Sequence, residues 1–379
     1  MGALDGIKVI EMSGLGPCPF AGMLLADMGA EVIKVERSTH RDPLYEKDIS
    51  ARGKKSVVLN LKTAEGREVL MRLIQSADVL IEGYRPGVAE RLGFGPTQCE
   101  AINDRLIYGR MTGWGQVGPL AGCAGHDLNY IAVSGALHAI GKSGESPTIP
   151  LNIVGDFAGG SLFLTNGILA ALFERTRSNL GQVVDAAMVD GVANLMWMYH
   201  SFSDVNQWNV SERGTNLLDG GAFFYDTFET FDCRHIALAS IEPQFFKELI
   251  ELAELDVTLF NTTSQYDRKQ WPILRQALAK IFKQKTQQQW CAILEGTDAC
   301  FAPVLTLKEA PLHPHNVARE TYLNVEGQVQ PAPAPRLSRT PSRVRHGKHE
   351  AGVDTYDLLA KLGYSAEAIR QLKMNGAVG

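Results

Sequence analysis

The sequence predicts an α/β protein with a parallel sheet in its first part and a smaller α+β domain after it. Three observations lead to this fold class. The chain has 379 residues, which is enough for more than one domain. In the first half, short β-branched runs alternate with segments of helical periodicity. Beyond a polar, glycine-rich stretch at residues 201–222, two adjacent strands are followed by helices instead.

The first β–α–β unit is Rossmann-like. A strand over residues 8–12 ends at a Gly/Pro loop, a helix opens near Pro19, and a second strand covers residues 31–36. The loop contains Gly14 and Gly16, but the third glycine position of the dinucleotide-binding fingerprint holds Pro19. We therefore do not expect a nicotinamide cofactor.

The alternation continues along the chain. Further strands are expected at residues 56–61, 78–82, 106–108 and 182–186, and helices at residues 63–76, 86–92 and 188–200. Thr63 is the expected N-cap of the first of these helices. Because strands that alternate with helices pair in parallel, we expect a parallel sheet that is covered on both faces.

The second half of the chain predicts a small domain between two linkers. Its expected strands are at residues 223–231, 235–240 and 301–305, and its helices at residues 243–255, 271–283 and 287–294. A Pro-rich stretch at residues 331–335 and two final helices, 356–362 and 366–374, follow. The predicted division is a large domain at 1–200, a linker at 201–222, a small domain at 223–310, a return linker at 311–335 and a final segment at 336–379.

Composition and charge argue against several classes of protein. With 45% hydrophobic and 21% charged residues the composition is that of an ordinary globular protein, and a net charge of −5 gives no reason to expect nucleic-acid binding. The six cysteines lack metal-ligand spacing and indicate free thiols in a reducing compartment. No signal peptide is predicted, and the longest apolar run, residues 161–173, is too short to span a bilayer. We expect a cytoplasmic protein without a membrane segment.

A histidine and a carboxylate, thirty positions apart, form the candidate catalytic pair. His126 follows Gly125, Asp156 follows Gly155, and each precedes an apolar segment that is predicted to be helical. Both then fall near a helix N-terminus, where free amides and the helix dipole favour an anion. Two proton-transfer groups beside such amides suit carbanion chemistry next to a carbonyl. The alternatives are a helix N-cap for Asp156 and a structural role for His126.

Basic residues cluster in the region of the predicted sheet. Most of them follow strand ends or open helices, where ligands of open α/β sheets bind. In an acidic protein this concentration suits a phosphorylated ligand, and the alternative is a solvated face. The residues are Arg37, Arg52, Lys54, Lys55, Lys62, Arg85 and Arg91.

Several motifs, in one order along the chain, carry a resemblance to a known family. They lie at residues 14–17 (Gly-Leu-Gly-Pro), 20–27, 82–88 (Glu-Gly-Tyr-Arg-Pro-Gly-Val), 110–116 (Arg-Met-Thr-Gly-Trp-Gly-Gln), 125–130, 151–157, 184–191, 241–245 and 334–339. Over nearly its whole length the sequence resembles the family III CoA-transferase superfamily (CaiB/BaiF type), and within it the alpha-methylacyl-CoA racemases.

The resemblance implies a fold and an assembly. In this family a Rossmann-like large domain is completed by the C-terminal tail, and two long linkers connect it with a small α+β domain. Two chains interlock as a homodimer. The active site then lies between one chain's large domain and its partner's small domain.

The resemblance also implies site residues. His126 and Asp156 would be the two bases on opposite faces of the substrate's α-carbon, His126 for the S and Asp156 for the R isomer of a 2-methylacyl-CoA thioester. Glu242 would orient His126, and Asn152 would support Asp156. The residues expected to contact the thioester region or the nucleotide part of CoA are Asp127, Tyr130, Arg37, Leu61, Lys62, Arg85 and Arg91. No metal or redox cofactor is expected, because CoA arrives with the substrate.

Physical chemistry adds two expectations. The enolate formed from a thioester needs preorganised donors, and helix N-terminal amides near Asp127 and Asp156 are candidates. A carboxylate at a helix N-terminus is a poor base unless burial offsets the dipole, so Asp156 should be partly desolvated. The sequence departs from the family at Cys18, Asn60 and Phe246, where Gly, Asp and Tyr are expected.

Two other functions fit the same resemblance. In a CoA-transferase of this fold, Asp156 would be a nucleophile that forms a covalent anhydride with the acyl group. Residues that weigh against it are His126, Glu242 and the Gly-Trp-Gly-Gln loop at 113–116. A non-catalytic acyl-CoA-binding protein is the second alternative.

Overall fold

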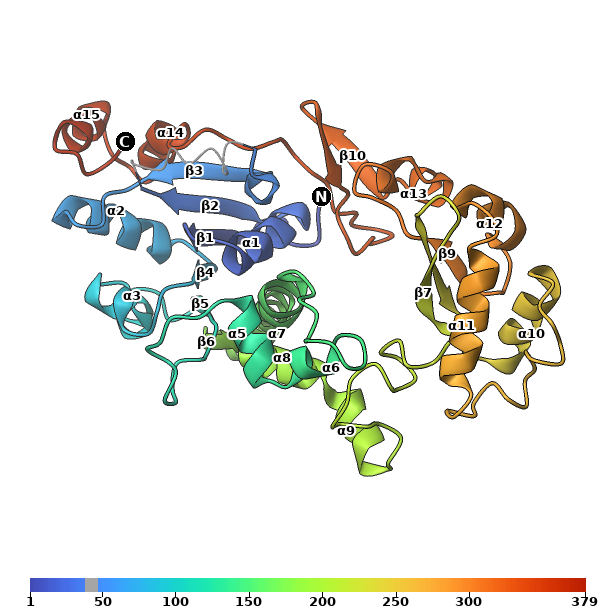
Figure 1. Cartoon of the computed structure of the whole chain (residues 1–379). Helices are drawn as coiled ribbons and strands as arrows, with labels where there is room; N and C mark the ends of the chain where they lie inside the picture. The colour runs from blue at the N-terminus through green and yellow to red at the C-terminus, as the bar shows by residue number, and fades with distance from the viewer. Residues whose placement is uncertain (38–46) are drawn as a thin grey trace. The chain divides into compact units, whose positions relative to one another are not determined.

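In the computed structural model the chain forms two compact units, and the structure describes residues 1–37 and 47–379. Unit 1 consists of Met1–Ser134, Leu151–Leu195 and His315–Gly379, and unit 2 of Gly135–Pro150 and Met196–Pro314. Figure 1 labels most of the helices and strands of both units.

Unit 1 is built on a six-stranded sheet in the order β3-β2-β1-β4-β5-β6, and every neighbouring pair is parallel. The expected parallel sheet is thus confirmed. Its strands are β1 (Lys8–Met12), β2 (Glu31–Glu36), β3 (Lys54–Val58), β4 (Val79–Glu82), β5 (Ile107–Thr112) and β6 (Val183–Ala187). Strand β5 runs four residues beyond its expected end because the polar side chains there, Arg110 among them, are buried rather than exposed.

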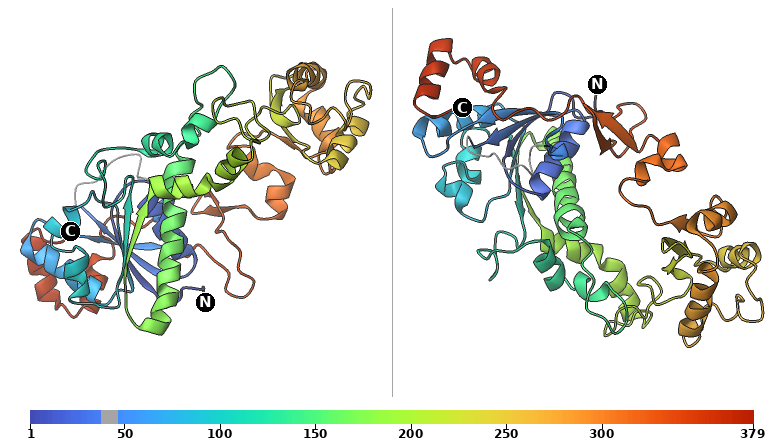
Figure 2. Two further views of the ribbon diagram at one scale, coloured as in Figure 1. Left: turned by 90° about the horizontal axis from the view of Figure 1, so that it is seen from below. Right: turned by 45° about the horizontal axis from the view of Figure 1, so that its top comes forward.

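Helices cover both faces of this sheet. They are α1 (Pro17–Asp27), α2 (Ala64–Gln75), α3 (Val88–Arg91), α4 (Pro96–Glu100), α5 (Asp127–Val133), α7 (Leu162–Ser178), α8 (Met188–Leu195), α14 (Thr355–Lys361) and α15 (Ala366–Met374), with the 3-10 turn η2 (Ile49–Ala51) and the π-helix η3 (Ile153–Ser161). Helices α1 and α7 pack on one face, and α2, α14 and α15 on the other. The left view of Figure 2 shows the sheet between these two layers. Thr63 caps α2 as expected, since its hydroxyl accepts a hydrogen bond from Gly66 N–H.

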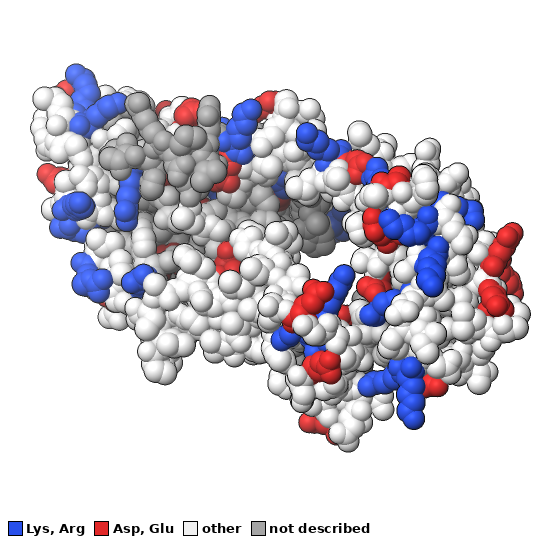
Figure 3. Space-filling model, in the orientation of Figure 1, with Lys and Arg blue, Asp and Glu red and all other residues white. Residues whose placement is uncertain are grey.

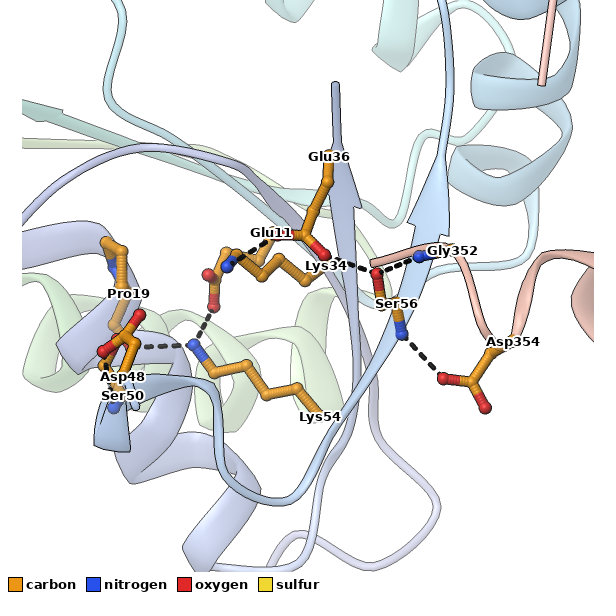
Figure 4. A network of polar contacts seen from close by, with 10 residues as sticks. All are labelled: Glu11, Pro19, Lys34, Glu36, Asp48, Ser50, Lys54, Ser56, Gly352 and Asp354. Atoms are coloured by element: carbon orange, nitrogen blue, oxygen red, sulfur yellow. Dashed lines mark hydrogen bonds and ion pairs between the residues drawn. The ribbon is translucent and has the colours of Figure 1, made fainter. Parts of the chain in front are cut away.

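The C-terminal segment completes unit 1, as the resemblance implies. Ser56 of β3 bonds to it twice: its N–H donates to Asp354 (2.8 Å), and its hydroxyl accepts from Gly352 N–H (2.8 Å). Figure 4 shows these bonds. Val378 pairs with Leu59 just beyond β3, and the amide of Asn60 donates to Gly376. The chain's last residues therefore hold the segment that follows β3.

Three of the predicted phosphate-binding cations form ion pairs within the fold instead. Arg52 and Asp27 are almost wholly buried and 2.6 Å apart. Lys54 Nζ lies 2.5 Å from buried Glu11 and also donates to Pro19 O, as Figure 4 shows. Lys55 pairs with the half-buried Glu31. Neither a phosphate site nor a solvated face describes Arg52 and Lys54, because buried carboxylates on adjacent elements neutralise their charges. The pair of Lys55 and Glu31 is partly exposed to solvent.

Unit 2 contains the expected small α+β fold. Its elements are α6 (Ala136–Ala139), α9 (Trp197–Asp204), β7 (Tyr225–Glu229), β8 (His235–Ala239), α10 (Pro243–Leu252), α11 (Trp271–Phe282), α12 (Gln287–Leu294), β9 (Phe301–Pro303) and η4 (Ala310–Leu312). The three strands form an antiparallel sheet in the order β7-β8-β9. Phe223, Phe224 and Phe246 are fully buried and in mutual contact, so they belong to its core.

The division of the chain differs from the sequence-based boundaries in three places. Residues 135–150 group with unit 2 because Arg213 donates to the carbonyls of His138 and Glu145 (both 2.7 Å). Half of the expected linker 201–222 folds around the fully buried Asn216. The expected return linker contains α13 (Pro314–Ala318) and a hairpin of β10 (Tyr322–Val325) and β11 (Gln328–Pro331), which Arg52 ties to unit 1 through Pro331 O (2.7 Å).

Helices η3 and α7 join into one helical segment, Ile153–Ser178, which is longer than the sequence suggested. By length and composition alone it could cross a membrane, with a mean hydropathy of 1.3 over its most apolar window, 44% of which is buried. The apolar run at residues 161–173 is only part of this segment, which η3 extends at its N-terminal end, and a buried core helix of this length meets the same criteria. Its buried side, which includes Leu164 and Ile168, packs on the sheet of unit 1.

We predict that replacing Lys54 destabilises unit 1 strongly. Lys54→Met leaves the carboxylate of Glu11 buried and unpaired, which costs about 3–5 kcal/mol of unfolding free energy. Burial already raises the pKa of Glu11, so the loss should shrink as the pH falls and Glu11 protonates.

Urea unfolding at several pH values measures this loss. Lys55→Met is the matched control, because its pair with Glu31 is solvent-accessible and worth less than about 1 kcal/mol. Equal losses in the two variants, or a loss at Lys54 that does not depend on pH, would contradict the prediction.

Candidate active site

A cavity of about 730 Å³ opens in unit 1 at the carboxyl edge of the sheet. It lies where the chain direction diverges, between the loops that follow β1 and β4, which is where open α/β sheets bind ligands. It is lined by residues of six segments: 14–18, 83–86, 111–114, 121–126 with Tyr130, Asn152 with Asp156, and Met188. The predicted residue Asp127 is not among them. His126, Asp156, Asn152, Tyr130 and Arg85 all lie on its wall, so the structure brings together these five predicted residues.

His126 occupies the N-cap position of α5 and is exposed. Its backbone N–H donates to the side chain of Asn129 (3.1 Å). The loop before it is held by Tyr130, whose hydroxyl donates to Gly125 O and whose ring packs edge-on against Trp114 at 4.8 Å. The backbone that presents His126 is therefore fixed by its own helix, and His126 lies on the cavity wall.

Asp156 is the fourth residue of η3, and Asn152 holds the N-cap position. The N-cap alternative for Asp156 is thus wrong. The side-chain amide of Asn152 donates to Asp156 Oδ2 at 2.9 Å, as the resemblance implied. Burial raises the pKa of Asp156, the bond from Asn152 opposes this, and the charge of Asp127 adds to the rise. The expected desolvation is therefore present, and it makes the carboxylate a stronger base.

Asp127 joins the two helices of the site. Its Oδ2 accepts hydrogen bonds from Gly155 N–H (2.6 Å) and Asp156 N–H (2.7 Å), and the residue is 5% exposed. Only glycine fits at 155, since a Cβ there would lie 2.6 Å from the Asp127 carboxylate. The amides of Gly155 and Asp156 are therefore occupied, which removes them from the expected donors for an enolate.

The loop after β1 closes over Asp156 from the other side. Gly16 has a φ of 64°, and a Cβ at this residue would lie 3.4 Å from Asp156 Oδ2. Ser161 at the end of η3 donates to Pro17 O (2.8 Å), which ties the loop to the helix. This close approach of backbone contributes to the desolvation of the carboxylate.

The remaining predicted cations lie along the same edge of the sheet. Arg37 follows β2, Lys62 follows β3, Arg85 follows β4 and Arg91 ends α3; all four side chains are exposed, and Leu61 is half-buried. Among the described residues none of the four forms an ion pair. In Figure 3, Lys and Arg outnumber acidic side chains over the face that carries α2 and α3. These cations are available to an anionic ligand.

Glu242 belongs to unit 2, where it precedes α10 and is exposed. The carbonyl of the neighbouring Ile241 accepts bonds from Gln265 and Tyr266, so the backbone at this point is held firmly. Its contact with His126 stays a prediction.

Trp114 is a wall residue to which sequence reasoning gave no role. Its ring supports Tyr130, and Gly113 beside it lies so close to Tyr130 that a Cβ would fall within 2.0 Å of that ring. The signal was the pair of glycines that flank the tryptophan at 113 and 115. In the part of the chain that the structure describes, no group of three His, Cys, Asp or Glu side chains could hold a metal ion.

Comparison with known proteins assigns a family. The model of CoA-transferase family III matches residues 4–355. Human alpha-methylacyl-CoA racemase is 45% identical, over 98% of this chain and 96% of its own length. The acetyl-CoA:oxalate CoA-transferase of Acetobacter aceti is 30% identical, over 89% of this chain and 90% of its own length. A solved CaiB/BaiF family protein from Brucella suis has the same fold, with a TM-score of 0.82 at 24% identity, covering 95% of this chain and 99% of its own.

The raised pKa of Asp156 predicts a pH-dependent effect on stability. A group whose pKa is higher in the folded state adds stability at low pH and loses it as the pH rises through that value. We expect Asp156→Asn to raise the melting temperature by about 2 °C at pH 8, with the gain vanishing as the pH falls and the wild-type carboxyl protonates. Calorimetry of both proteins across pH checks this; the exposed Asp104→Asn should show no such trend.

Proposed function

The chain belongs to CoA-transferase family III, and from this premise we propose that it is an alpha-methylacyl-CoA racemase. The observation that carries the proposal is the presence of two proton-transfer groups, His126 and Asp156, on the wall of one cavity. The higher identity to the human racemase than to the transferase supports the same conclusion.

The reaction is a 1,1-proton transfer at the α-carbon of a 2-methylacyl-CoA. One base removes the α-proton to give an enolate, and the conjugate acid of the other returns a proton to the opposite face, which inverts the centre. By the resemblance His126 serves the S isomer and Asp156 the R isomer. The desolvated carboxylate of Asp156 suits this task, because its raised pKa brings it nearer to that of a useful base.

The enolate oxygen requires a donor that is not already engaged. Since Asp127 occupies the amides of Gly155 and Asp156, the backbone N–H at the start of α5 is the better candidate. It lies next to His126 and at the positive end of the helix. Of the two residues that the resemblance implies at the thioester, Tyr130 lines the cavity and would border it, whereas Asp127 would act through the amides of Gly155 and Asp156 that it holds.

Binding of the CoA part would use the exposed cations Arg37, Lys62, Arg85 and Arg91, with Leu61 against the adenine. The reaction needs no metal or redox cofactor, because the thioester itself acidifies the α-proton. We further propose an interlocked homodimer in which Glu242 of one chain orients His126 of the other, and a cytoplasmic location.

A CoA-transferase with Asp156 as covalent nucleophile is the alternative that a specific observation favours. The 30% identical relative is a transferase, and Asp156 stands at the cavity wall with its Oδ2 held by Asn152. A covalent anhydride would need a carboxylate acceptor for the CoA. A non-catalytic acyl-CoA-binding protein would need neither His126 nor Asp156.

We predict α-proton exchange with racemisation and without an acceptor. One pure enantiomer of a 2-methylacyl-CoA is incubated in D₂O with no added carboxylate, and deuterium uptake and configuration are followed together. His126→Ala and Asp156→Ala should each lose about 10²–10⁴-fold in rate, because each removes an acid–base group. His200→Ala and Asp104→Asn, both exposed, are the matched controls.

The alternatives give different results in the same assay. Absence of exchange, with CoA transfer once a carboxylate is supplied, would assign Asp156 as a nucleophile and refute the racemase. Binding of the thioester with neither reaction would leave only the acyl-CoA-binding protein. Glu242→Gln tests the proposed orientation of His126 and should slow exchange of the S isomer more than that of the R isomer.

A further inference from the structure

Arg110 of β5 joins two carboxylates at the carboxyl edge of the sheet. Its Nε lies 3.0 Å from Glu82 Oε1, and its Nη1 lies 2.9 Å from Glu90 Oε1. Arg110 is 7% exposed and Glu82 is fully buried, whereas the side chain of Glu90 is 38% exposed. Neither Glu82 nor Arg110 lines the cavity, although both belong to the sequence motifs at 82–88 and 110–116.

Glu82 connects this pair to the loop that carries Arg85. Its second oxygen, Oε2, accepts a hydrogen bond from Tyr84 N–H at 2.7 Å. Tyr84 and Arg85 line the cavity, so the buried carboxylate fixes the turn from which the Arg85 side chain extends. A carboxylate that accepts both a guanidinium and an amide bond holds such a turn more firmly than a neutral acceptor.

Glu90 connects the pair to the element that carries Arg91. It lies in the single-turn helix α3, directly before Arg91. A four-residue helix has little stability of its own, so its orientation depends on tertiary contacts. The bond from Arg110 is one such contact, and it links α3 to strand β5.

We propose that Arg110 is a positioning residue for CoA binding, acting through Arg85 and Arg91. This inference rests on the proposed function. One buried guanidinium, planar and with several donors, fixes two neighbouring segments at once and sets the spacing of the two cations that meet the phosphates of CoA. Lysine cannot replace it, because a single ammonium does not span both carboxylates.

A purely structural role for Arg110 is the competing interpretation, and the protein contains a matched control. Arg175 of α7 is 8% exposed and pairs with Asp78 at 2.8 Å. Asp78 directly precedes β4, so this ion pair lies at the amino edge of the sheet, away from the cavity. Loss of Arg175 should lower the stability of unit 1 but leave the contacts of the segments that carry Arg85 and Arg91 unchanged.

The experiment measures the dissociation constant of CoA by calorimetry, together with KM and kcat for α-proton exchange. Arg110→Lys should weaken CoA binding and raise KM about tenfold, the worth of one charge-assisted contact, and leave kcat within about threefold. Arg175→Lys should change neither constant. Glu90→Gln removes a charge from a partly exposed side chain, so the fold tolerates it, and it should weaken CoA binding about threefold.

A double-mutant cycle separates positioning from general loosening. In a variant that already carries Arg85→Ala and Arg91→Ala, adding Arg110→Lys should weaken CoA binding no further. Three outcomes would overturn this inference but not the proposed function, provided that the wild type binds CoA. They are an undiminished effect of Arg110→Lys in that background, equal effects of the Arg110 and Arg175 variants, and unchanged CoA binding in Arg110→Lys. A wild type that does not bind CoA would overturn the proposed function with it.

Discussion

The carboxylate of Asp127 is the contact on which the geometry of the site depends. Asp127 is the first residue of α5, directly after His126, and its Oδ2 accepts hydrogen bonds from the amides of Gly155 and Asp156 in η3. Two segments that are far apart in the sequence are thereby joined at their N-termini, and both candidate bases face one cavity. The bond also places a second carboxylate next to Asp156, which contributes to the rise in its pKa.

The cations of unit 1 divide into a buried group and an exposed group, which have different roles. In or next to the strands, buried cations such as Arg52, Lys54 and Arg110 are neutralised by carboxylates on neighbouring elements. Such pairs gain little net stability but make the loss of either partner expensive. The cations just beyond the strand ends, Arg85 among them, are exposed and can meet an anionic ligand. Of the buried group, Arg110 contacts Glu82 and Glu90, which lie in the segments that carry Arg85 and Arg91.

The periodicity of apolar residues predicted most helices and strands. The sequence did not predict which charged side chains are buried. The helix after Thr63 and the sheet around residues 8–12 follow from local patterns that the tertiary structure only reinforces. By contrast, Lys54 and Arg110 have side chains that a single sequence marks as exposed, and only their partners on other strands reveal them as interior. Sequence spacing gives no access to such partners, because ion pairs form across strands that are distant along the chain.

Local pattern and residue type are enough to predict the alternation that makes a parallel sheet, to single out His126 and Asp156 as candidate proton-transfer groups, and to reveal the family resemblance. The tertiary structure decided three further matters. Asp156 sits inside a π-helix rather than at its cap, Asp127 takes the amides that the enolate was expected to use, and only part of the basic set remains free for a ligand. Each of these depends on contacts between segments that are distant along the chain, and local sequence patterns do not reveal which hydrogen-bond donor meets which acceptor.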